Sequence, residues 1–295
     1  MPGRRLEAGV AVLGQRLVVL GGFDTSLAEG LTLTNEVDVF DPAVAMWSTL
    51  VPAPVAWTHI NLAAIGGTLY LVGGLEGQQY TARGEVYKLG PGDTAWMQLT
   101  SMPAGQERGA AGIVVSPPHI FLLGGASTIG AYKSCLDYNI IDDTWSMLPD
   151  LPSPRTHLAG MRMADGTLIA AGGLRSLDAT MPLDEVWALP VNATTWTARA
   201  PMPTPRGGCA YGLVLNQLIC AGGEAGQAAL FFTQSYDAIS DVWTTLPDMP
   251  EQRAGTQGGA IGGKLYVPGG AVRLVFEPTS TLYIYDALAT TTRKH

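Results

Sequence analysis

Charged residues are scarce in this chain. They make up 14% of the 295 residues, whereas hydrophobic residues make up 47%. Intrinsic disorder is excluded, because disordered segments combine low hydrophobicity with high charge. Positive charge is the scarcer sign, since 17 basic residues stand against 25 acidic ones and the formal net charge is −8. We therefore expect no nucleic-acid partner, because nucleic-acid-binding domains carry basic surfaces.

Cysteines and long apolar runs are also scarce. The three cysteines, Cys135, Cys209 and Cys220, form no CxxC pair, and an odd count with this spacing predicts neither a disulfide framework nor a zinc site. We interpret Cys209 and Cys220 as small core residues. No apolar run reaches the length of a transmembrane helix, so we expect no membrane partner. The N-terminus lacks the apolar segment of a signal peptide, which predicts a cytoplasmic protein, or a secreted one if a signal has been removed.

Glycine and proline, in contrast, are abundant, with 37 and 20 residues, which predicts many turns and few long helices. The glycines also form a repeat. A Gly-Gly doublet follows a short apolar run six times, at intervals of 47 to 52 residues. The doublets are Gly21-Gly22, Gly73-Gly74, Gly124-Gly125, Gly172-Gly173, Gly222-Gly223 and Gly269-Gly270. Five doublets are followed by a tryptophan, namely Trp47, Trp96, Trp145, Trp196 and Trp243, whereas Thr292 occupies the sixth position.

Each repeat contains four short apolar runs bounded by Gly, Asn, Asp and Pro, which is typical of strands. This pattern resembles the Kelch repeat family over essentially the whole chain. The resemblance implies an all-β fold, a six-bladed Kelch-type β-propeller with four antiparallel strands per blade. We expect a single domain over residues 1–295, with blades at about 5–54, 55–105, 106–154, 155–205, 206–252 and 253–295. The doublet glycines are expected where a side chain would collide with the next blade or where φ is positive.

The loops between the second and third strands are the long ones, so the face that carries them is the predicted binding face. At the start of the first strand, one position is arginine in five of the six blades: Arg5, Trp57, Arg108, Arg155, Arg206 and Arg253. These arginines predict an anion site at the channel mouth, and some Kelch proteins use arginines at this repeat position to capture acidic peptides. The alternative is that they belong to the repeat consensus and bond loop carbonyls of the next blade. Trp57 is interpreted either as a stacking platform or as a residue packed between blades.

Two residues further along stand Glu7, His59, Ala110, His157, Gly208 and Gly255. Strand alternation predicts that these side chains point the same way as the arginines. His59, His157 and Glu7 are the catalytic candidates if the protein is an enzyme. Because blades 2 and 4 are not neighbours, we expect the two imidazoles to lie too far apart to share an ion. We therefore predict no metal site and no cofactor.

The long loops of blades 5 and 6 are unusually apolar, with Phe231, Phe232 and Phe276. If exposed, these side chains would form an apolar wall beside the arginines; the alternative is that they begin the third strands. The leading hypothesis is a non-catalytic interaction module that recognises an acidic peptide, a protein segment or a small carboxylate on the long-loop face. One rival is a sugar-acid mutarotase or lyase whose arginines hold the substrate carboxylate. The other is a purely structural domain of a larger chain.

Overall fold

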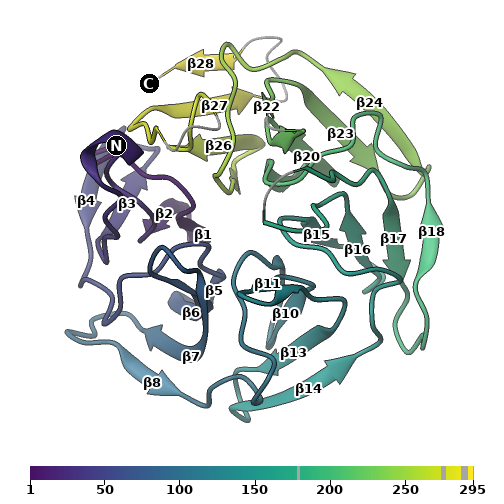
Figure 1. The fold of residues 1–295 in the computed structure, drawn as a ribbon, viewed down its shortest axis with the longest axis horizontal. Helices are drawn as coiled ribbons and strands as arrows, with labels where there is room; N and C mark the ends of the chain where they lie inside the picture. Colours follow the sequence, from purple (N-terminus) through teal and green to yellow (C-terminus); the bar gives the residue numbers. More distant parts are fainter. Residues whose placement is uncertain (178–179, 227, 274–276, 287–291, 295) are drawn as a thin grey trace.

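Six four-stranded antiparallel sheets surround a central axis in a computed structural model of the protein (Figure 1). The structure describes residues 1–177, 180–226, 228–273, 277–286 and 292–294. Within these residues the single helical element is the 3-10 turn η1 (Leu27–Glu29), and no helix is long and apolar enough to cross a membrane. The predicted six-bladed all-β propeller is therefore confirmed.

The strands run outward from the axis in chain order within each blade. Blade 1 contains β1 (Gly9–Leu13), β2 (Arg16–Leu20), β3 (Val37–Asp41) and β4 (Met46–Thr49), and blade 2 contains β5 (Leu62–Ile65), β6 (Thr68–Glu76), β7 (Thr81–Leu89) and β8 (Met97–Leu99). Blade 3 contains β9 (Gly112–Ser116), β10 (His119–Leu123), β13 (Cys135–Asn139) and β14 (Thr144–Leu148), and blade 4 contains β15 (Ala159–Arg162), β16 (Leu168–Ala171), β17 (Val186–Leu189) and β18 (Thr197–Arg199). Blade 5 contains β19 (Ala210–Val214), β20 (Gln217–Ala221), β23 (Thr233–Asp237) and β24 (Val242–Leu246), and blade 6 contains β25 (Gly259–Ile261), β26 (Lys264–Pro268), β27 (Leu282–Asp286) and β28 (Thr292–Lys294).

The hydrophobic core lies between the blades. One cluster joins Val18 and Leu20 of β2 to Trp57 and to Leu69 and Leu71 of β6, so it fills the space between blades 1 and 2. The second strand of each blade is buried along nearly its whole length because both of its faces meet a neighbouring sheet. Two short ribbons extend the long loops: β11 (Ala126–Ser127) pairs with β12 (Gly130–Ala131), and β21 (Glu224–Ala225) pairs with β22 (Ala228–Ala229).

The doublet glycines lie where a side chain would collide with the next blade, as predicted, and their backbones link successive blades. The first glycine has a positive φ and lies against the main-chain oxygen of the next blade's Arg position. A Cβ at Gly222 would lie 2.3 Å from the oxygen of Arg253, which no side chain tolerates. In every blade except blade 2, the second glycine donates its N–H to that same oxygen, over 2.7 Å from Gly223 to Arg253. A glycine is therefore required there by both contact and conformation.

The same contacts close the ring between blades 6 and 1. The N–H of Gly270 donates to the oxygen of Arg5 over 2.8 Å, and the N–H of Arg5 donates to the oxygen of Thr279 over 3.1 Å. Blades 1 and 6 each contain four strands of their own, so no strand is exchanged between the ends of the chain. Thr292 is paired with Tyr285 in the same strand register in which Trp243 is paired with Tyr236. Thr292 therefore occupies the position of the missing tryptophan.

The repeated tryptophans tie the outer strands to the preceding blade. In four blades the tryptophan indole N–H donates to a main-chain oxygen about 45 residues upstream, in the segment that enters the blade, over 2.9 to 3.1 Å. These tryptophans are Trp96, Trp145, Trp196 and Trp243. Trp243 also stacks on Tyr236, with ring centroids 4.9 Å apart. The tryptophan thus combines a ring contact within its blade and a hydrogen bond between blades.

Replacing Trp243 by alanine should therefore lower the free energy of unfolding by about 2–4 kcal/mol, because a half-buried ring contact and an interblade hydrogen bond are both lost. Urea denaturation of Trp243→Ala and of the exposed control Ile239→Ala measures the difference. Equal unfolding midpoints for the two variants would contradict the assigned role.

Candidate functional site

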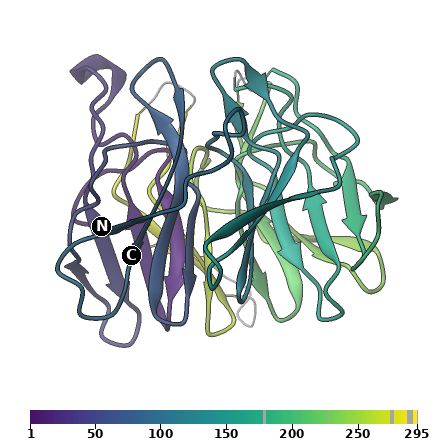
Figure 2. The same cartoon turned by 90° about the horizontal axis from the view of Figure 1, so that it is seen from below.

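The long loops emerge from one face of the ring. Figure 2 shows η1 and the β6–β7 hairpin projecting on this side, whereas the opposite face carries short turns. On the long-loop side, the starts of the six inner strands meet around the axis. Here lie Glu7, His59, Ala110, His157, Gly208 and Gly255, which we call the axial ring. All six residues have positive φ, between 52° and 64°.

Main-chain hydrogen bonds link the members of the axial ring directly. The N–H of His59 donates to the oxygen of Glu7 over 2.8 Å, that of Ala110 donates to His59 over 2.9 Å, and that of His157 donates to Ala110 over 2.8 Å. The N–H of Gly208 donates to the oxygen of His157, and the N–H of Glu7 donates to the oxygen of Gly255. The ring is consequently narrow, and its side chains converge on the axis.

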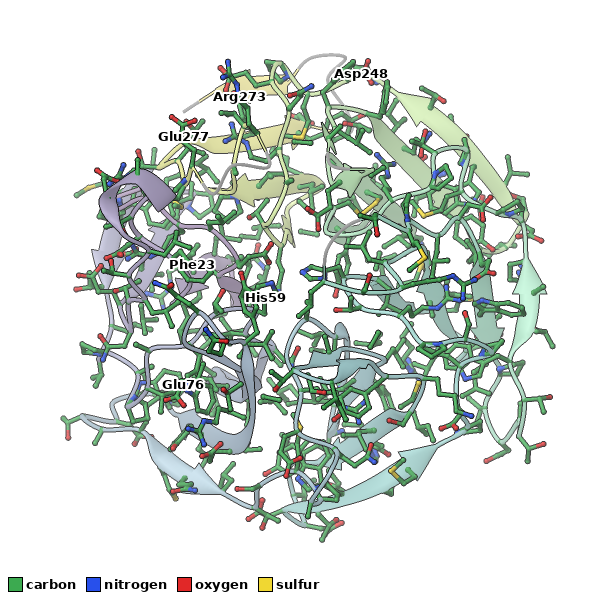
Figure 3. All side chains as sticks on the ribbon, in the orientation of Figure 1. Phe23, His59, Glu76, Asp248, Arg273 and Glu277 are labelled. Atoms are coloured by element: carbon green, nitrogen blue, oxygen red, sulfur yellow. A yellow bond between two sulfur atoms is a disulfide. The ribbon has the colours of Figure 1, made fainter. Side chains whose placement is uncertain are left out.

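Glu7, His59 and His157 meet at the centre of this ring. The Nε2 atom of each imidazole lies 3.6 Å from Oε2 of Glu7, and the two imidazole rings stand edge to face with centroids 5.1 Å apart. Figure 3 shows His59 at the inner end of blade 2, facing the centre. Both histidine side chains are more than nine-tenths buried, and Nε2 of His157 is buried with no hydrogen-bond partner.

The preceding threonines orient the two imidazoles. The hydroxyl of Thr156 donates to the oxygen of Ala110 over 3.1 Å, and it also lies 3.2 Å from Nδ1 of His157. Because a hydroxyl has one proton, Nδ1 must be the donor in the second contact. Thr58 makes the same two contacts beside His59. Neutral imidazoles so held present the Nε2 lone pair to the axis.

Burial and mutual charge set the electrostatics of the cluster. Burial alone would raise the pKa of Glu7, but the two imidazoles lower it to about 2, so the carboxylate is ionised. Burial lowers the pKa of His59 to about 4 and keeps that ring neutral. Burial likewise opposes protonation of His157, yet the Glu7 carboxylate raises its pKa above the usual value. The cluster therefore combines one anion, one neutral imidazole at His59, and a second imidazole at His157 whose protonation the anion favours.

A cavity of about 30 Å³ adjoins the three side chains, which is room for one water or ion. Its other lining residues include Tyr211 and Gln257 of the inner strands further from the long-loop face. The Tyr211 hydroxyl accepts the N–H of Ile113 across the axis, and the Gln257 amide donates to the oxygen of Ile60. On the long-loop side, Tyr80 in the β6–β7 hairpin contacts His59 edge to face at 5.3 Å. The cluster is thus enclosed from both sides.

Glu224 is a further acidic residue of this site, and the sequence analysis missed it. It is 9% exposed, and burial raises its pKa to about 7. The repeat did contain a signal. The residue after the doublet is apolar in the other five blades, with Phe23, Leu75, Ala126, Leu174 and Ala271, and acidic only here. Tyr80 lies in a loop without a repeat signal.

Two expectations about the axial ring are wrong. The imidazoles of blades 2 and 4 are in contact, because only one residue, Ala110, separates them in a ring whose members bond main chain to main chain. The axial side chains also do not point the same way as the arginines. Strand alternation fails because the left-handed conformation at each axial residue turns its side chain toward the axis.

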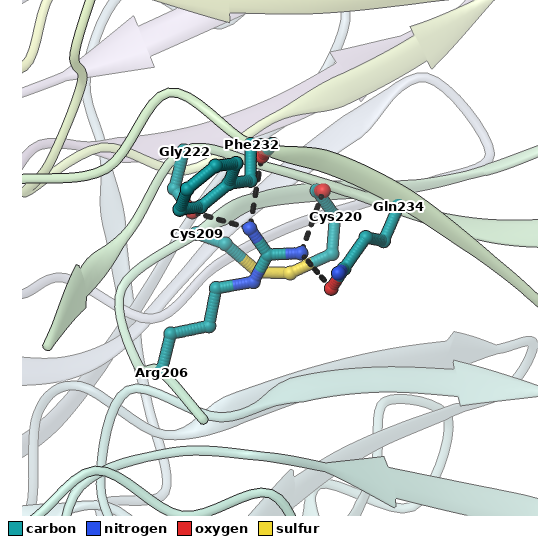
Figure 4. The surroundings of a disulfide bond; sticks show 6 residues. All are labelled: Arg206, Cys209, Cys220, Gly222, Phe232 and Gln234. Atoms are coloured by element: carbon teal, nitrogen blue, oxygen red, sulfur yellow. Dashed lines mark hydrogen bonds between the residues drawn. A yellow bond between two sulfur atoms is a disulfide. The ribbon is translucent and has the colours of Figure 1, made fainter. Parts of the chain in front are cut away.

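The five arginine side chains are buried, with exposed fractions between 0% and 2%. They form hydrogen bonds within their own blades or with the segment that enters the blade. Arg206 donates to the oxygens of Gly222, Phe232 and Cys220 and to the Gln234 side chain over 2.7 to 3.3 Å (Figure 4). Arg108 and Arg155 likewise donate to the doublet and to the residue that precedes the third strand. Arg5 donates to Glu36 and Asp38, and Arg253 donates to Glu251. A direct ligand contact would require these bonds to break, which favours a structural role. The expectation that the arginines bond the next blade is nevertheless wrong, because the acceptors lie in their own blade or in the segment that enters it, and those of Arg5 and Arg253 are mainly carboxylates.

The remaining candidates divide between core and surface. Trp57 is 2% exposed and packs with Tyr87 between blades 1 and 2, which is the interblade alternative for this residue. Phe231 is 36% exposed and contacts Phe232, with ring centroids 4.5 Å apart. Both precede β23, so they lie in the loop rather than in an early strand. Phe276 lies outside the described residues.

Cys209 and Cys220 are core residues, as predicted, but the expectation of no disulfide is wrong. They form a disulfide between the start of β19 and the end of β20, with Cα atoms 5.6 Å apart (Figure 4). Cys209 lies one residue after Gly208 and lines the axial cavity. The spacing did not predict the bond because the ten residues between the two positions form a β-hairpin, which returns the chain to its starting point.

Comparison with known proteins agrees with this architecture. Residues 59–270 match the model of the KLHDC2/KLHL20/DRC7 Kelch-repeats domain, and residues 4–54 match the Kelch motif. The fold therefore belongs to the class of Kelch-type propellers. The first of these matches covers most of the sequence, and the chain belongs to the Kelch repeat family.

Several curated proteins are similar. Kelch-like protein terF of Aspergillus terreus is 32% identical over 286 residues, which are 91% of this chain and 61% of that protein. Kelch-like protein 35 of Mus musculus is 25% identical over 93% of this chain and 45% of its own length. The F-box/kelch-repeat protein SKIP30 of Arabidopsis thaliana is 31% identical over 42% of this chain and 39% of its own length. The chain thus spans less than two thirds of each of these relatives.

Because the arginines hold their blades together, Arg206→Ala should lower the free energy of unfolding by about 2–4 kcal/mol, since several buried oxygens lose their donor. Arg206→Lys should recover little, because an ammonium group cannot reproduce the planar fork. The exposed Arg175→Ala is the control and should change stability by less than about 1 kcal/mol. Unfolding curves that overlay for Arg206→Ala and Arg175→Ala would show that the buried bonds contribute nothing.

Removal of the disulfide in a Cys209→Ala, Cys220→Ala double variant should lower the free energy of unfolding by about 2–3 kcal/mol, as expected for a short closed loop. Denaturation of the oxidised protein, the reduced protein and the double variant provides the comparison. If reduction left the unfolding midpoint in place, the bond would have no stabilising role.

Proposed function

We propose that this chain is an interaction module that binds a protein or peptide segment of mixed apolar and acidic character on the long-loop face of blades 3, 4 and 5. The observation that carries this proposal is a series of exposed apolar side chains. Ile129 is 92% exposed, Met181 is 49% exposed and Phe231 is 36% exposed. They belong to the long loops of three consecutive blades, and exposed apolar side chains beside exposed cations suit a contact surface.

The charges beside these residues favour an acidic partner. Lys133 adjoins Ile129 in blade 3, and Arg175 lies in the same loop as Met181. Both cations are about half exposed, and their partners are surface carboxylates: Lys133 lies 3.1 Å from Asp150, and Arg175 lies 4.0 Å from Glu185. Exposed ion pairs contribute less than about 1 kcal/mol. A carboxylate of the partner can therefore compete for either cation.

A surface depression in blade 3 gives the partner a place to insert a side chain. It has a volume of about 380 Å³ and is lined by Ile129, Tyr132, Lys133, Asp150 and Pro154. The buried Arg108 guanidinium stacks on the Tyr132 ring at 4.1 Å and supports it from below. An apolar floor with one cation at its edge suits an anchor residue followed by an acidic one.

Selection of peptides from a random displayed library against the immobilised protein tests the proposal. We expect the selected peptides to be rich in acidic and apolar residues, and their affinity to fall at least about tenfold for the double variant Ile129→Ser, Phe231→Ser. Lys133→Ser should weaken binding and reduce its salt dependence, because screening acts on exposed charge.

The same blade offers a matched control. Ile141 is 75% exposed in the short turn between β13 and β14, on the opposite face from Ile129. Ile141→Ser should leave peptide affinity unchanged. Peptides that bind both variants as well as the unaltered protein would contradict the proposed face.

The subcellular location stays a prediction. The Cys209–Cys220 disulfide is the observation that bears on it, because such bonds persist in oxidising compartments and are rare in the cytosol. It favours the secreted alternative over the cytoplasmic one. A non-reducing mass measurement on protein recovered from its natural source distinguishes them.

A further inference from the structure

We propose that Glu7, His59 and His157 bind one divalent transition-metal ion on the propeller axis. Nε2 of His59, Nε2 of His157 and a carboxylate oxygen of Glu7 all lie within 4.8 Å of one another. They come from blades 2, 4 and 1, and the main-chain bonds of the axial ring hold their backbones in place. Among the described residues they are the one group of three such side chains that converges in this way.

The spacing of the ligand atoms fits a coordinated ion. Each imidazole Nε2 lies 3.6 Å from Oε2 of Glu7, which is beyond a hydrogen bond. Ligands at about 2.0–2.2 Å from a tetrahedral ion are separated by about 3.3–3.6 Å. The three ligand atoms lie within 4.8 Å of one another, so rotation of the imidazoles has to bring the two nitrogens closer together when an ion binds.

The burial of Nε2 of His157 also points to a ligand at this place, since its polar neighbour there is Oε2 of Glu7 at 3.6 Å. The His157 side chain is 7% exposed, and its Nε2 atom is buried without a hydrogen-bond partner. A buried polar atom without a partner costs about 1–3 kcal/mol. It faces a cavity of about 30 Å³ that has room for a single ion or water.

The hydrogen bonds at Nδ1 of the two histidines are of the kind that metal-bound histidines form. Thr58 and Thr156 accept the Nδ1–H groups, and each hydroxyl is itself fixed because it donates to a main-chain oxygen of the axial ring. Metal-bound histidines commonly donate their other ring nitrogen to such a group, which fixes the tautomer. Here both histidines direct their Nε2 lone pairs toward Glu7.

The donor set selects the class of ion. Two imidazoles and a carboxylate suit Zn²⁺, Fe²⁺ and their neighbours, whereas Mg²⁺ and Ca²⁺ prefer oxygen ligands alone. Three protein ligands leave at least one coordination position open. The three other axial residues, Ala110, Gly208 and Gly255, are too small to reach the ion. A Cβ at Gly208 would lie 3.5 Å from Oε1 of Glu224, so this carboxyl stands on the open side. A water or a small oxygen-donor ligand would complete the coordination there.

Metal titration of the untagged, oxidised protein tests the proposal. After dialysis against EDTA, we expect one equivalent of Zn²⁺ or Co²⁺ to bind, with a Co²⁺ visible spectrum of imidazole–carboxylate ligation, and no comparable binding of Mg²⁺. Glu7→Gln, His59→Gln and His157→Gln should each abolish this stoichiometric binding. Thr156→Val should weaken it about 10–100-fold. His119→Gln is the matched control, because His119 pairs with Asp137 on the opposite face, and it should bind as the unaltered protein does.

A measurement without variants covers the case in which a variant does not fold. Imidazole nitrogen NMR of the ¹⁵N-histidine-labelled protein should show the Nε2 signals of His59 and His157 shifting when one equivalent of Zn²⁺ is added, while those of His119 stay in place. The proposal is overturned if no equivalent of metal binds, if binding survives the three ligand substitutions, or if the two Nε2 signals do not respond. In the last case the cluster is a structural ion pair between His157 and Glu7.

Discussion

The main-chain hydrogen bonds at the start of the inner strands are the constraint on which the rest of this structure depends. On the inner side, each axial residue from Glu7 to Gly208 donates to the residue of a neighbouring blade. Further out, in every blade except blade 2, the second doublet glycine donates to the oxygen at the next blade's Arg position, for example Gly270 to Arg5. Because these bonds need only backbone atoms, the side chains of the axial ring stay free for other uses. The six repeats can therefore differ in chemistry at the axis while keeping one geometry.

The arginines have a structural role, whereas the axial residues form the candidate site, although the two positions are only two residues apart in the sequence. An arginine two residues before the axial position turns into its own blade, where Arg206 bonds four acceptors and holds the second strand, the third strand and the doublet together. The axial residue turns the opposite way because its φ is positive. Non-glycine residues in this conformation each cost of order 1–3 kcal/mol. Glu7, His59 and His157 carry that cost at the site where their side chains meet.

The repeat predicted the fold because every element of it has a local cause. The doublets, the tryptophans and the turn residues mark strand ends, and the strands of blade 5 fall within one or two residues of their apolar runs. The site was predicted only in part. Its residue types were recognised, but the contact between His59 and His157 depends on the width of the axial ring, which is a property of six blades closing together. The Cys209–Cys220 bond likewise depends on hairpin register rather than on cysteine spacing. Glu224 could have been predicted from the sequence, because it occupies a repeat position that is apolar in the other five blades.

The two proposed sites differ in what determines their size. The axial site is bounded by a hydrogen-bonded ring and closed beneath by Tyr211 and Gln257, so it admits an ion or a very small ligand. The long loops of blades 3 to 5 rise outside this ring, where neither the doublets nor the axial bonds restrict their length or composition. Ile129, Met181 and Phe231 are exposed there because no neighbouring blade reaches them. A propeller of this kind can therefore change its macromolecular partner by loop substitution without disturbing the axis. It cannot enlarge the axial site without breaking the bonds that close the ring.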